Sequence, residues 1–331
     1  MLIEERKGLV LAKLGNRYKV LSTVPSPDYA EAVAFVQVPK DYCGDFLQDA
    51  SKVRDDLGLE AVVFFTAAEL PDSFVSLSEG DVKVAATVAM TPQTCIGTIN
   101  VAVVVNRPLS KWGMADLLRT ATEAKALAAV DSLLRCNGRR SPGTVTDAVA
   151  ILAQEGDGEH YAGPATELGQ TAARLVYKAV RAGDRYDLFQ RIFGLSRREF
   201  AGLVKRLFEK APLPAGEEEI LSALEELLKD PNVWALLIAA AELDAHATSG
   251  GIPGLAPDEH SADTPRIIID ELLGAALADY IGGFKAVLTT YWVERVKKDG
   301  GIPELEMFRD DVLSALLAGV YLRLYERIYG R

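Results

Sequence analysis

Small, hydroxyl and carboxamide residues gather where the apolar strands of the first half of the chain begin. Gly97-Thr98-Ile99-Asn100 and Gly143-Thr144-Val145-Thr146-Asp147 each open such a strand, and Thr120 to Lys125 lies in a helix between them. Carboxylates, ammonium groups and hydroxyls are the groups that carry acid–base or nucleophilic chemistry. Each segment alone also fits a structural role, because glycines make turns and threonines are common in strands.

The second half carries acidic pairs followed by small residues at helical spacing. Asp270-Glu271 begins one predicted helix, Asp310-Asp311 begins another, and Asp263 precedes the first pair by seven residues. If the two helices approach closely, their carboxylates converge and require a cation, and oxygen ligands favour Mg²⁺ or Mn²⁺. The alternative is that acids simply stabilise the first turn of a helix, which explains Asp310-Asp311 better than Asp270-Glu271.

Two different patterns position these residues. Up to about residue 184 the chain alternates short apolar strands with helices, and after it only helical periodicity remains. Gly15-Asn16 predicts a hairpin turn, Thr144–Leu152 a strand, and Ser110 the start of a helix that Asn137-Gly138 ends. We therefore expect an α/β domain with a mixed sheet at residues 1–190 and an all-α domain at residues 191–331.

Composition excludes several classes of protein. The 331 residues carry a net charge of −11 without a basic stripe, which argues against nucleic-acid binding. No apolar run approaches the roughly 20 residues that a membrane span needs, and no secretory signal follows Met1. The three scattered cysteines predict no disulfide and a reducing, cytoplasmic location, and the three histidines show no zinc spacing.

Six segments of the first half, in order, resemble the adenosylcobinamide amidohydrolase family over residues 18–182. They are Leu21-Ser22-Thr23-Val24-Pro25, Thr66-Ala67-Ala68, Gly97-Thr98-Ile99-Asn100, Thr122-Glu123-Ala124-Lys125-Ala126, Gly143-Thr144-Val145-Thr146-Asp147 and Tyr161-Ala162-Gly163 with Thr166, Leu168 and Gly169. Ser26-Pro27-Asp28-Tyr29 and Val145 depart from the family pattern. The resemblance implies hydrolysis of adenosylcobinamide to adenosylcobyric acid and 1-amino-2-propanol.

Amide hydrolysis requires a polarised carbonyl, an activated nucleophile and a proton donor for the amine. The resemblance implies oxyanion donors at Thr98 and Asn100, a base at Glu123 or Asp147, and Lys125 as its partner or as the acid. Thr144 or Thr146 is the candidate nucleophile, with direct attack by water as the alternative. Substrate contacts are expected at Gly97, Tyr161 and Gly163. Cys95 is a weaker nucleophile candidate, because no histidine lies near it in sequence.

The second half resembles the phosphatidylglycerophosphatase A superfamily, in its archaeal α-ribazole phosphatase branch, over residues 196–328. The matching residues are Asp263-Thr264-Pro265, Ile267-Ile268-Ile269-Asp270-Glu271 with Gly274, and Asp310-Asp311 with Ala318-Gly319. The resemblance implies a Mg²⁺ or Mn²⁺ site at Asp263, Asp270, Glu271, Asp310 and Asp311. Arg295 and Lys297 are expected to hold phosphate, although their segment, Val293 to Gly301, lacks the proline of the family's Lys-Pro-Gly pattern.

Together the two resemblances predict a bifunctional hydrolase of cobamide salvage. Its expected ligands are a corrinoid and a phosphorylated nucleoside-like molecule, and the pattern allows a homo-oligomer. Two alternatives stay open. One is a corrinoid-binding module with a non-catalytic helical scaffold, and the other is a lipid-phosphate phosphatase in the second domain.

Overall fold

The computed structural model describes residues 1–330, and the chain divides into two compact units, Met1–Asp187 and Leu188–Arg331. The first unit is a mixed α/β sheet domain and the second is helical, so the predicted fold class is confirmed. The division lies three residues before the boundary expected from the sequence. Each unit is described below by itself.

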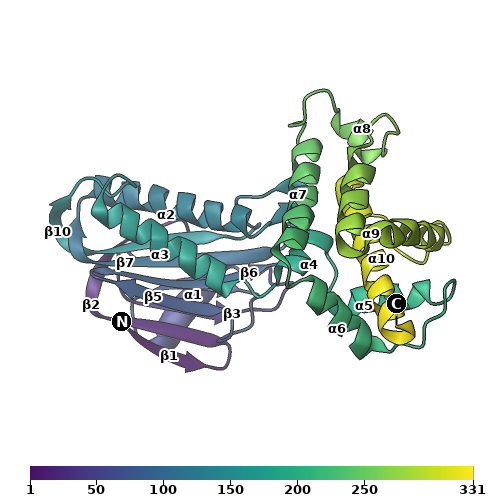
Figure 1. Ribbon diagram of the computed structural model, residues 1–331. Helices are drawn as coiled ribbons and strands as arrows, with labels where there is room; N and C mark the ends of the chain where they lie inside the picture. The colour runs from purple at the N-terminus through teal and green to yellow at the C-terminus, as the bar shows by residue number, and fades with distance from the viewer. Residues whose placement is uncertain (331) are drawn as a thin grey trace. The chain divides into compact units, whose positions relative to one another are not determined.

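An eight-stranded sheet forms the first unit, in the order β4-β3-β2-β10-β7-β6-β5 with β1 paired to β2 (Figure 1). Its strands are β1 (Leu2–Arg6), β2 (Leu9–Ser22), β3 (Tyr29–Gln37), β4 (Ala61–Thr66), β5 (Phe74–Glu79), β6 (Val82–Met90), β7 (Gly97–Leu109) and β10 (Ala148–Glu159). The β3–β4 and β7–β10 pairs are parallel. Their crossovers contain α1 (Phe46–Leu57) and α2 (Lys111–Asp131), as parallel pairing requires.

The sheet bends around an apolar interior. Phe35 of β3 contacts Phe64 of β4 and Phe74 of β5, although β3 and β5 are far apart in the strand order. Helices α2 and α3 (Glu167–Gly183) lie side by side over the outer face of β6, β7 and β10 (Figure 1). Helix α1 packs on the other part of the outer face, formed by β2 to β4. The ends of β3 and β4 therefore come close to the starts of β7 and β10.

Three local predictions were wrong. Strand β2 runs through Gly15-Asn16 as one strand, because the positive φ of Gly15, +83°, accompanies an irregularity in the β2–β3 register rather than a hairpin. Helix α2 ends at Asp131, and Asn137-Gly138 instead forms the turn between β8 (Arg135–Cys136) and β9 (Arg139–Arg140). Strand β10 begins at Ala148, since Thr144 to Asp147 form a loop held by side-chain hydrogen bonds.

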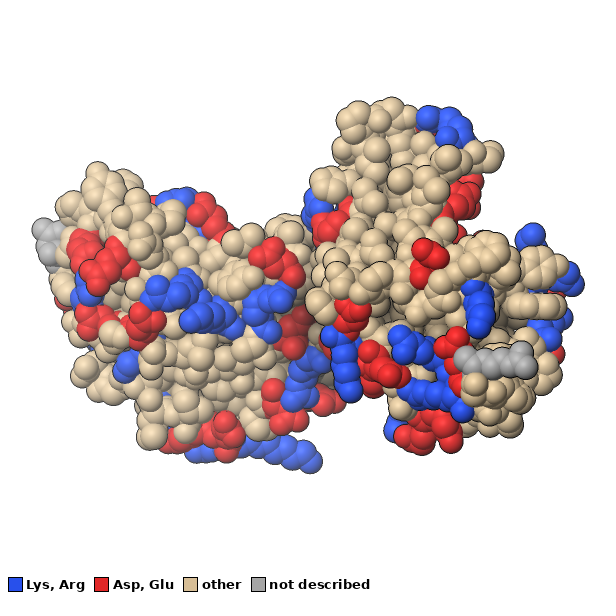
Figure 2. Space-filling view, in the orientation of Figure 1, with Lys and Arg blue, Asp and Glu red and all other residues tan. Residues whose placement is uncertain are grey.

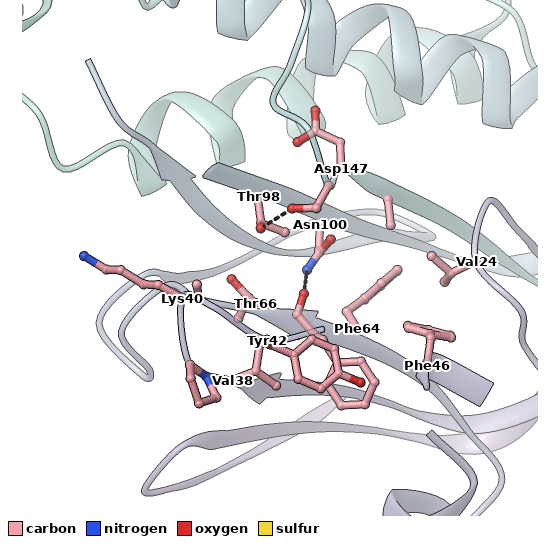
Figure 3. A pocket seen from close by; sticks show the side chains of 15 residues that line it. Val24, Val38, Lys40, Tyr42, Phe46, Phe64, Thr66, Thr98, Asn100 and Asp147 are labelled. Atoms are coloured by element: carbon pink, nitrogen blue, oxygen red, sulfur yellow. Dashed lines mark hydrogen bonds between the residues drawn. The ribbon is translucent and has the colours of Figure 1, made fainter. Parts of the chain in front are cut away.

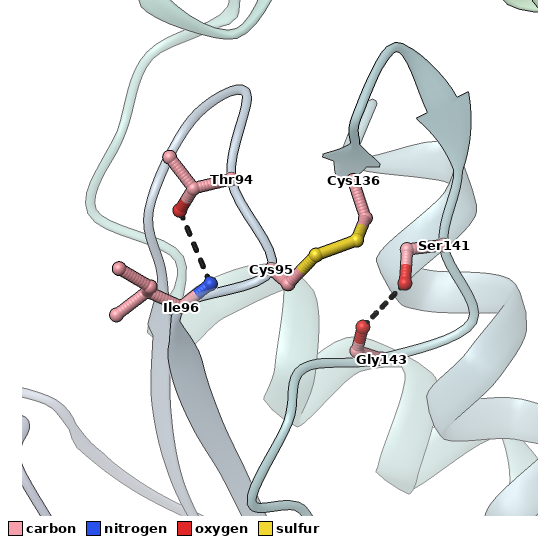
Figure 4. The surroundings of a disulfide bond; sticks show 6 residues. All are labelled: Thr94, Cys95, Ile96, Cys136, Ser141 and Gly143. Atoms are coloured by element: carbon pink, nitrogen blue, oxygen red, sulfur yellow. Dashed lines mark hydrogen bonds between the residues drawn. A yellow bond between two sulfur atoms is a disulfide. The ribbon is translucent and has the colours of Figure 1, made fainter.

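Cys95 and Cys136 form a disulfide, which corrects the prediction of three unpaired cysteines (Figure 4). Their separation of 41 residues concealed the pairing, since the two cysteines meet only after α2 returns the chain to the start of β7. Cys43 is free and exposed. A cytoplasmic location stays a prediction.

Seven helices make the second unit. They are α4 (Leu188–Phe193), α5 (Arg197–Leu207), α6 (Glu217–Leu227), α7 (Pro231–Thr248), α8 (Pro257–Ser261), α9 (Ile269–Lys298) and α10 (Met307–Tyr329). Every residue from Val312 to Val320 is buried, so α10 forms the centre of the core. Gly282 and Gly283 have non-helical backbone angles and break α9 into two segments.

Helix α9 exposes a large apolar surface. Leu272, Tyr280, Phe284 and Leu288 are each more than half exposed. By length and composition alone, α9 is the one described helix that qualifies as a candidate membrane span. The sequence pattern does not single out α9, because the helix contains scattered charges instead of an uninterrupted apolar run. The absence of a membrane span stays a prediction.

Acidic and basic side chains are interspersed on the molecular face in Figure 2. This distribution agrees with the absence of a basic stripe in the sequence. The expected lack of nucleic-acid binding stays a prediction.

Candidate active site

A cavity of about 330 Å³ opens at the end of the bent sheet in the first unit (Figure 3). Its apolar wall includes Tyr42, Phe46, Phe64 and Phe65, which follow or belong to β3, α1 and β4. The facing wall is polar and is formed by Thr98 and Asn100 at the start of β7 and by Thr146 and Asp147 in the loop before β10.

Asp147 lies at the polar end and receives four hydrogen bonds. Its Oδ1 accepts from the Ile99 backbone N–H at 2.9 Å and from the Thr144 hydroxyl at 2.5 Å. Its Oδ2 accepts from the Thr144 backbone N–H at 3.1 Å and from Lys125 Nζ. A carboxylate has about four lone-pair sites, so these donors fill them all. A catalytic water molecule can therefore bind Asp147 only by displacing one of these four donors.

Two glycines allow the polar loops to close on each other. A Cβ added to Gly143 would lie 2.1 Å from Asp147 Oδ2 and 2.6 Å from Lys125 Nζ. A Cβ added to Gly97, whose φ is +154°, would lie 2.1 Å from the Ala89 carbonyl. Gly143 therefore gives the ion pair its space, and Gly97 lets β7 start against β6.

Thr98 and Thr146 form a hydroxyl pair on the cavity wall. Their Oγ1 atoms are 2.7 Å apart, and the Thr146 hydroxyl donates to the Gly97 carbonyl at 2.9 Å. Asn100 Nδ2 donates to the Phe65 carbonyl at 3.0 Å and so joins the polar wall to the aromatic one. The structure thus brings together the six expected residues Thr98, Asn100, Lys125, Thr144, Thr146 and Asp147, with Gly97 beside them.

Glu123, Tyr161 and Gly163 lie elsewhere. Glu123 accepts from Arg119 Nη1 at 2.9 Å and lines a different cavity, between α2 and α3. Tyr161 is 76% exposed, and Gly163 accepts from the Thr166 hydroxyl before α3. Successive residues of a helix point about 100° apart, so Glu123 and Lys125, which are two positions apart, point in nearly opposite directions. Lys125 faces the site, and Glu123 therefore points away from it.

The aromatic wall is a part of the cavity that the sequence did not identify. Tyr42 contacts Phe65, with ring centroids 5.4 Å apart, and its hydroxyl donates to Asp49 at 2.8 Å. Burial and this hydrogen bond raise the pKa of Tyr42 to about 12, so the phenol stays neutral near pH 7. In the sequence, Tyr42 and Phe46 resemble ordinary apolar positions after β3, and their spacing does not mark them as part of a site.

In the second unit three of the five expected metal ligands converge. Carboxylate oxygens of Asp270, Glu271 and Asp311 lie within 4.8 Å of one another. Burial is the main cause that raises the pKa of Asp270 to about 7, and it raises the pKa of Asp311 to about 7 as well. Asp270 Oδ1 is buried without a hydrogen-bond partner. An uncompensated buried oxygen beside two other carboxylates fits the ligand set of a hard divalent cation.

Asp310 and Asp263 lie outside this group. Asp310 accepts from Lys297 Nζ at 2.5 Å and from the Leu305 backbone N–H at 2.9 Å. Lys297 is buried and also lies 3.1 Å from Glu294, so it serves an internal ion-pair network. Arg295 is exposed and donates to the Tyr291 hydroxyl at 3.0 Å.

Asp244 anchors the start of α10, where Asp311 lies. This buried carboxylate accepts from the backbone N–H groups of Phe308 and Arg309 at 3.0 and 3.1 Å, and from Arg309 Nε at 2.9 Å. His260 Nε2 lies 2.9 Å from Asp244 Oδ1, the oxygen that also accepts from Phe308. The sequence did not reveal this network, because Phe308 and Arg309 follow Asp244 by 64 and 65 residues.

Comparisons with known proteins follow the division into units. The family model described as adenosylcobinamide amidohydrolase matches residues 2–187. Two proteins of Methanocaldococcus jannaschii are similar to the chain. The uncharacterized protein MJ1330 is 34% identical over 33% of this chain and 86% of its own length, and the uncharacterized protein MJ1613 is 26% identical over 54% and 86%.

Two solved structures are also similar in part. The low temperature requirement C protein from Listeria monocytogenes gives a TM-score of 0.37 and 21% identity, over 43% of this chain and 92% of that one. Protein ypjQ from Bacillus subtilis gives a TM-score of 0.36 and 19% identity, over 41% and 88%. The family match covers more than half of the chain and the whole cavity with its Asp147 network. The chain belongs to the adenosylcobinamide amidohydrolase family.

Proposed function

We propose that the first unit hydrolyses the amide bond between the aminopropanol arm and the corrin ring of adenosylcobinamide. The observation that carries this proposal is the Asp147 network at the polar end of an otherwise apolar cavity. A cavity of about 330 Å³ is at the low end for small-molecule sites, which span about 300–1,000 Å³. It suits the amide arm and leaves the macrocycle outside.

Asp147 is the base in this proposal. The Thr144 hydroxyl already donates to Asp147 Oδ1, so its proton has a defined acceptor when the oxygen attacks the amide carbon. Lys125 holds the other carboxylate oxygen and orients it. The C–N bond then breaks, the amine leaves with a proton, and water hydrolyses the ester on Thr144.

Thr98 and Asn100 stabilise the oxyanion. Both face the cavity, and Asn100 carries two N–H donors, of which one binds the Phe65 carbonyl. We assign the second donor of Asn100 to the substrate oxygen. The Thr98 hydroxyl donates to Thr146 Oγ1 in the structure, so it reaches the substrate oxygen only by turning away from Thr146. Donors fixed before the reaction stabilise developing charge without reorganisation.

Asp147→Asn with Glu123→Gln as the matched control tests these roles. Asp147→Asn should lower turnover by about 10²-fold or more, the scale for a lost acid–base group, and Glu123→Gln should retain activity. Thr144→Ala separates the two routes. If Thr144 attacks, this variant is inactive and the acid-quenched wild-type enzyme carries an ester adduct. Activity in Thr144→Ala without any adduct would show direct attack by water.

The three converging carboxylates of the second unit support a separate proposal. We propose that this unit carries out metal-dependent hydrolysis of a phosphate monoester such as α-ribazole 5′-phosphate. Asp270, Glu271 and Asp311 would hold Mg²⁺ or Mn²⁺, and the observation that carries this is the unpartnered Asp270 Oδ1. When bound, such an ion neutralises phosphate and activates water.

Asp270→Asn and Asp263→Asn are the matched pair for this second activity. Phosphate release should stop after treatment with EDTA, return with Mg²⁺, and be lost in Asp270→Asn but not in Asp263→Asn. Full release by metal-stripped protein would overturn the proposal. Release from a phosphatidylglycerophosphate vesicle, but not from α-ribazole phosphate, would instead identify a lipid-phosphate phosphatase.

A further inference from the structure

The Cys95–Cys136 disulfide joins the two segments that form the Asp147 network (Figure 4). Cys95 precedes Gly97 by two residues, and Cys136 lies in β8, ahead of the loop that begins at Ser141. The two Cα atoms are 4.7 Å apart. No other covalent link connects these segments within the described residues, apart from the chain itself.

On the Cys95 side, three successive contacts attach the segment to the loop of Asp147. The Cys95 carbonyl accepts from the Val145 backbone N–H at 3.1 Å. The Gly97 carbonyl then accepts from the Thr146 hydroxyl at 2.9 Å, and the Ile99 N–H donates to Asp147 at 2.9 Å. Cys95, Gly97 and Ile99 thus contact the consecutive residues Val145, Thr146 and Asp147, which gives a continuous path of hydrogen bonds from the cysteine to the carboxylate.

On the Cys136 side, the β8–β9 hairpin leads directly into the same loop. The Ser141 backbone N–H donates to the Leu134 carbonyl at 3.1 Å, and its hydroxyl donates to the Gly143 carbonyl at 2.5 Å. Lys125 Nζ lies 3.5 Å from the Pro142 carbonyl. The hairpin thus leads into a loop that also contacts Lys125, the partner of Asp147.

We propose that the disulfide is a positioning element of the amide-hydrolysis site and makes its activity depend on thiol redox state. The inference rests on the proposed function. With the bond intact, segments 95–99 and 141–147 are held together, and Asp147 keeps its hydrogen bonds to Ile99 and Thr144. Without it, loop 91–96 is held by hydrogen bonds that reach the surface, since Ile96 is 65% and Val145 70% exposed. Segments held in this way open more often.

Reduction requires a dithiol, for example a thioredoxin-type protein or dithiothreitol. One dithiol thiolate attacks a sulfur of the half-buried Cys95–Cys136 bond and forms a mixed disulfide, and its second thiol closes to release the protein. The protein gains two electrons and two protons, giving two thiols, and the dithiol becomes a disulfide. Air or an oxidised dithiol reverses the exchange.

The test uses the full chain with Cys43→Ser, which removes the free exposed cysteine. Reduction should lower kcat about tenfold, change KM much less, and be reversed by reoxidation, because misplaced catalytic groups reduce turnover more than binding. Cys95→Ser/Cys136→Ser should show the same low kcat and no response to the dithiol. A folded, reduced protein with full kcat would overturn the proposal.

Hydrogen exchange provides a readout that needs no substrate. The Ile99 and Thr144 amides, which donate to Asp147, should exchange about tenfold faster after reduction, and amides in the centre of β7 should not change. Unchanged exchange at both positions would refute the positioning role. Faster exchange in a protein that never releases aminopropanol would support the positioning role and contradict the proposed function.

Discussion

Asp147 and Lys125 form an ion pair almost closed to solvent, with side-chain exposures of 12% and 7%. Removal of one partner leaves a charge without compensation, which typically costs about 3–5 kcal/mol. We expect Lys125→Met to lower the free energy of unfolding by about 3 kcal/mol and to abolish amide hydrolysis. Lys125→Met/Asp147→Asn should regain at least half of that stability and stay inactive, as measured by urea denaturation. Equal stability of both variants would show that the pair is not coupled.

The second prediction at this scale concerns the substitution Gly143→Ala. An added Cβ would overlap Asp147 Oδ2 and Lys125 Nζ, so Gly143→Ala must push the pair apart. Turnover should fall by about 10²-fold, the scale of a 1 Å misplacement. Gly202→Ala in α5 is the control, because its Cβ meets nothing within 4 Å and alanine favours a helix by about 1 kcal/mol. Normal turnover in Gly143→Ala would contradict the proposed geometry.

At the level of helices, the starts of α9 and α10 bring together Asp270, Glu271 and Asp311. Because the pKa values of Asp270 and Asp311 are raised to about 7, the folded metal-free protein binds more protons than the unfolded chain between about pH 4 and 7. Its stability should therefore fall as the pH rises through this range.

Mg²⁺ should reverse this loss, because it competes with protons for the same oxygens. We expect the increase in Tm on adding Mg²⁺ to be larger at pH 8 than at pH 5.5, and to vanish in Asp270→Asn. Differential scanning fluorimetry of the full chain measures it. An equal increase at both pH values would indicate binding elsewhere.

Sequence patterns predicted which segments approach one another better than which atoms meet. The glycine and threonine segments at the starts of β7 and β10 were identified because their residue types are unusual beside apolar strands. The orientation of Glu123 and the choice of Asp311 over Asp310 depend on how each helix is rotated about its axis. The Cys95–Cys136 bond joins residues that are 41 positions apart. Local periodicity does not carry that information.

For the whole molecule, the division at Asp187 and Leu188 predicts independent folding. Fragments 1–187 and 188–331 should each unfold cooperatively, since each has its own buried core. Amide hydrolysis should remain with the first fragment and phosphate release with the second. Calorimetry with both assays measures this, and a first fragment that folds but requires the second for amide hydrolysis would show a shared site.

The central claim is that the Asp147 cavity hydrolyses the aminopropanol amide of adenosylcobinamide. Its most direct test is incubation of the full chain with adenosylcobinamide, followed by mass spectrometry of both products. We predict equimolar adenosylcobyric acid and 1-amino-2-propanol from the wild-type and Glu123→Gln proteins, and a rate lower by about 10²-fold or more for Asp147→Asn. Unchanged substrate after incubation with folded wild-type protein, or equal rates for all three proteins, would contradict the account.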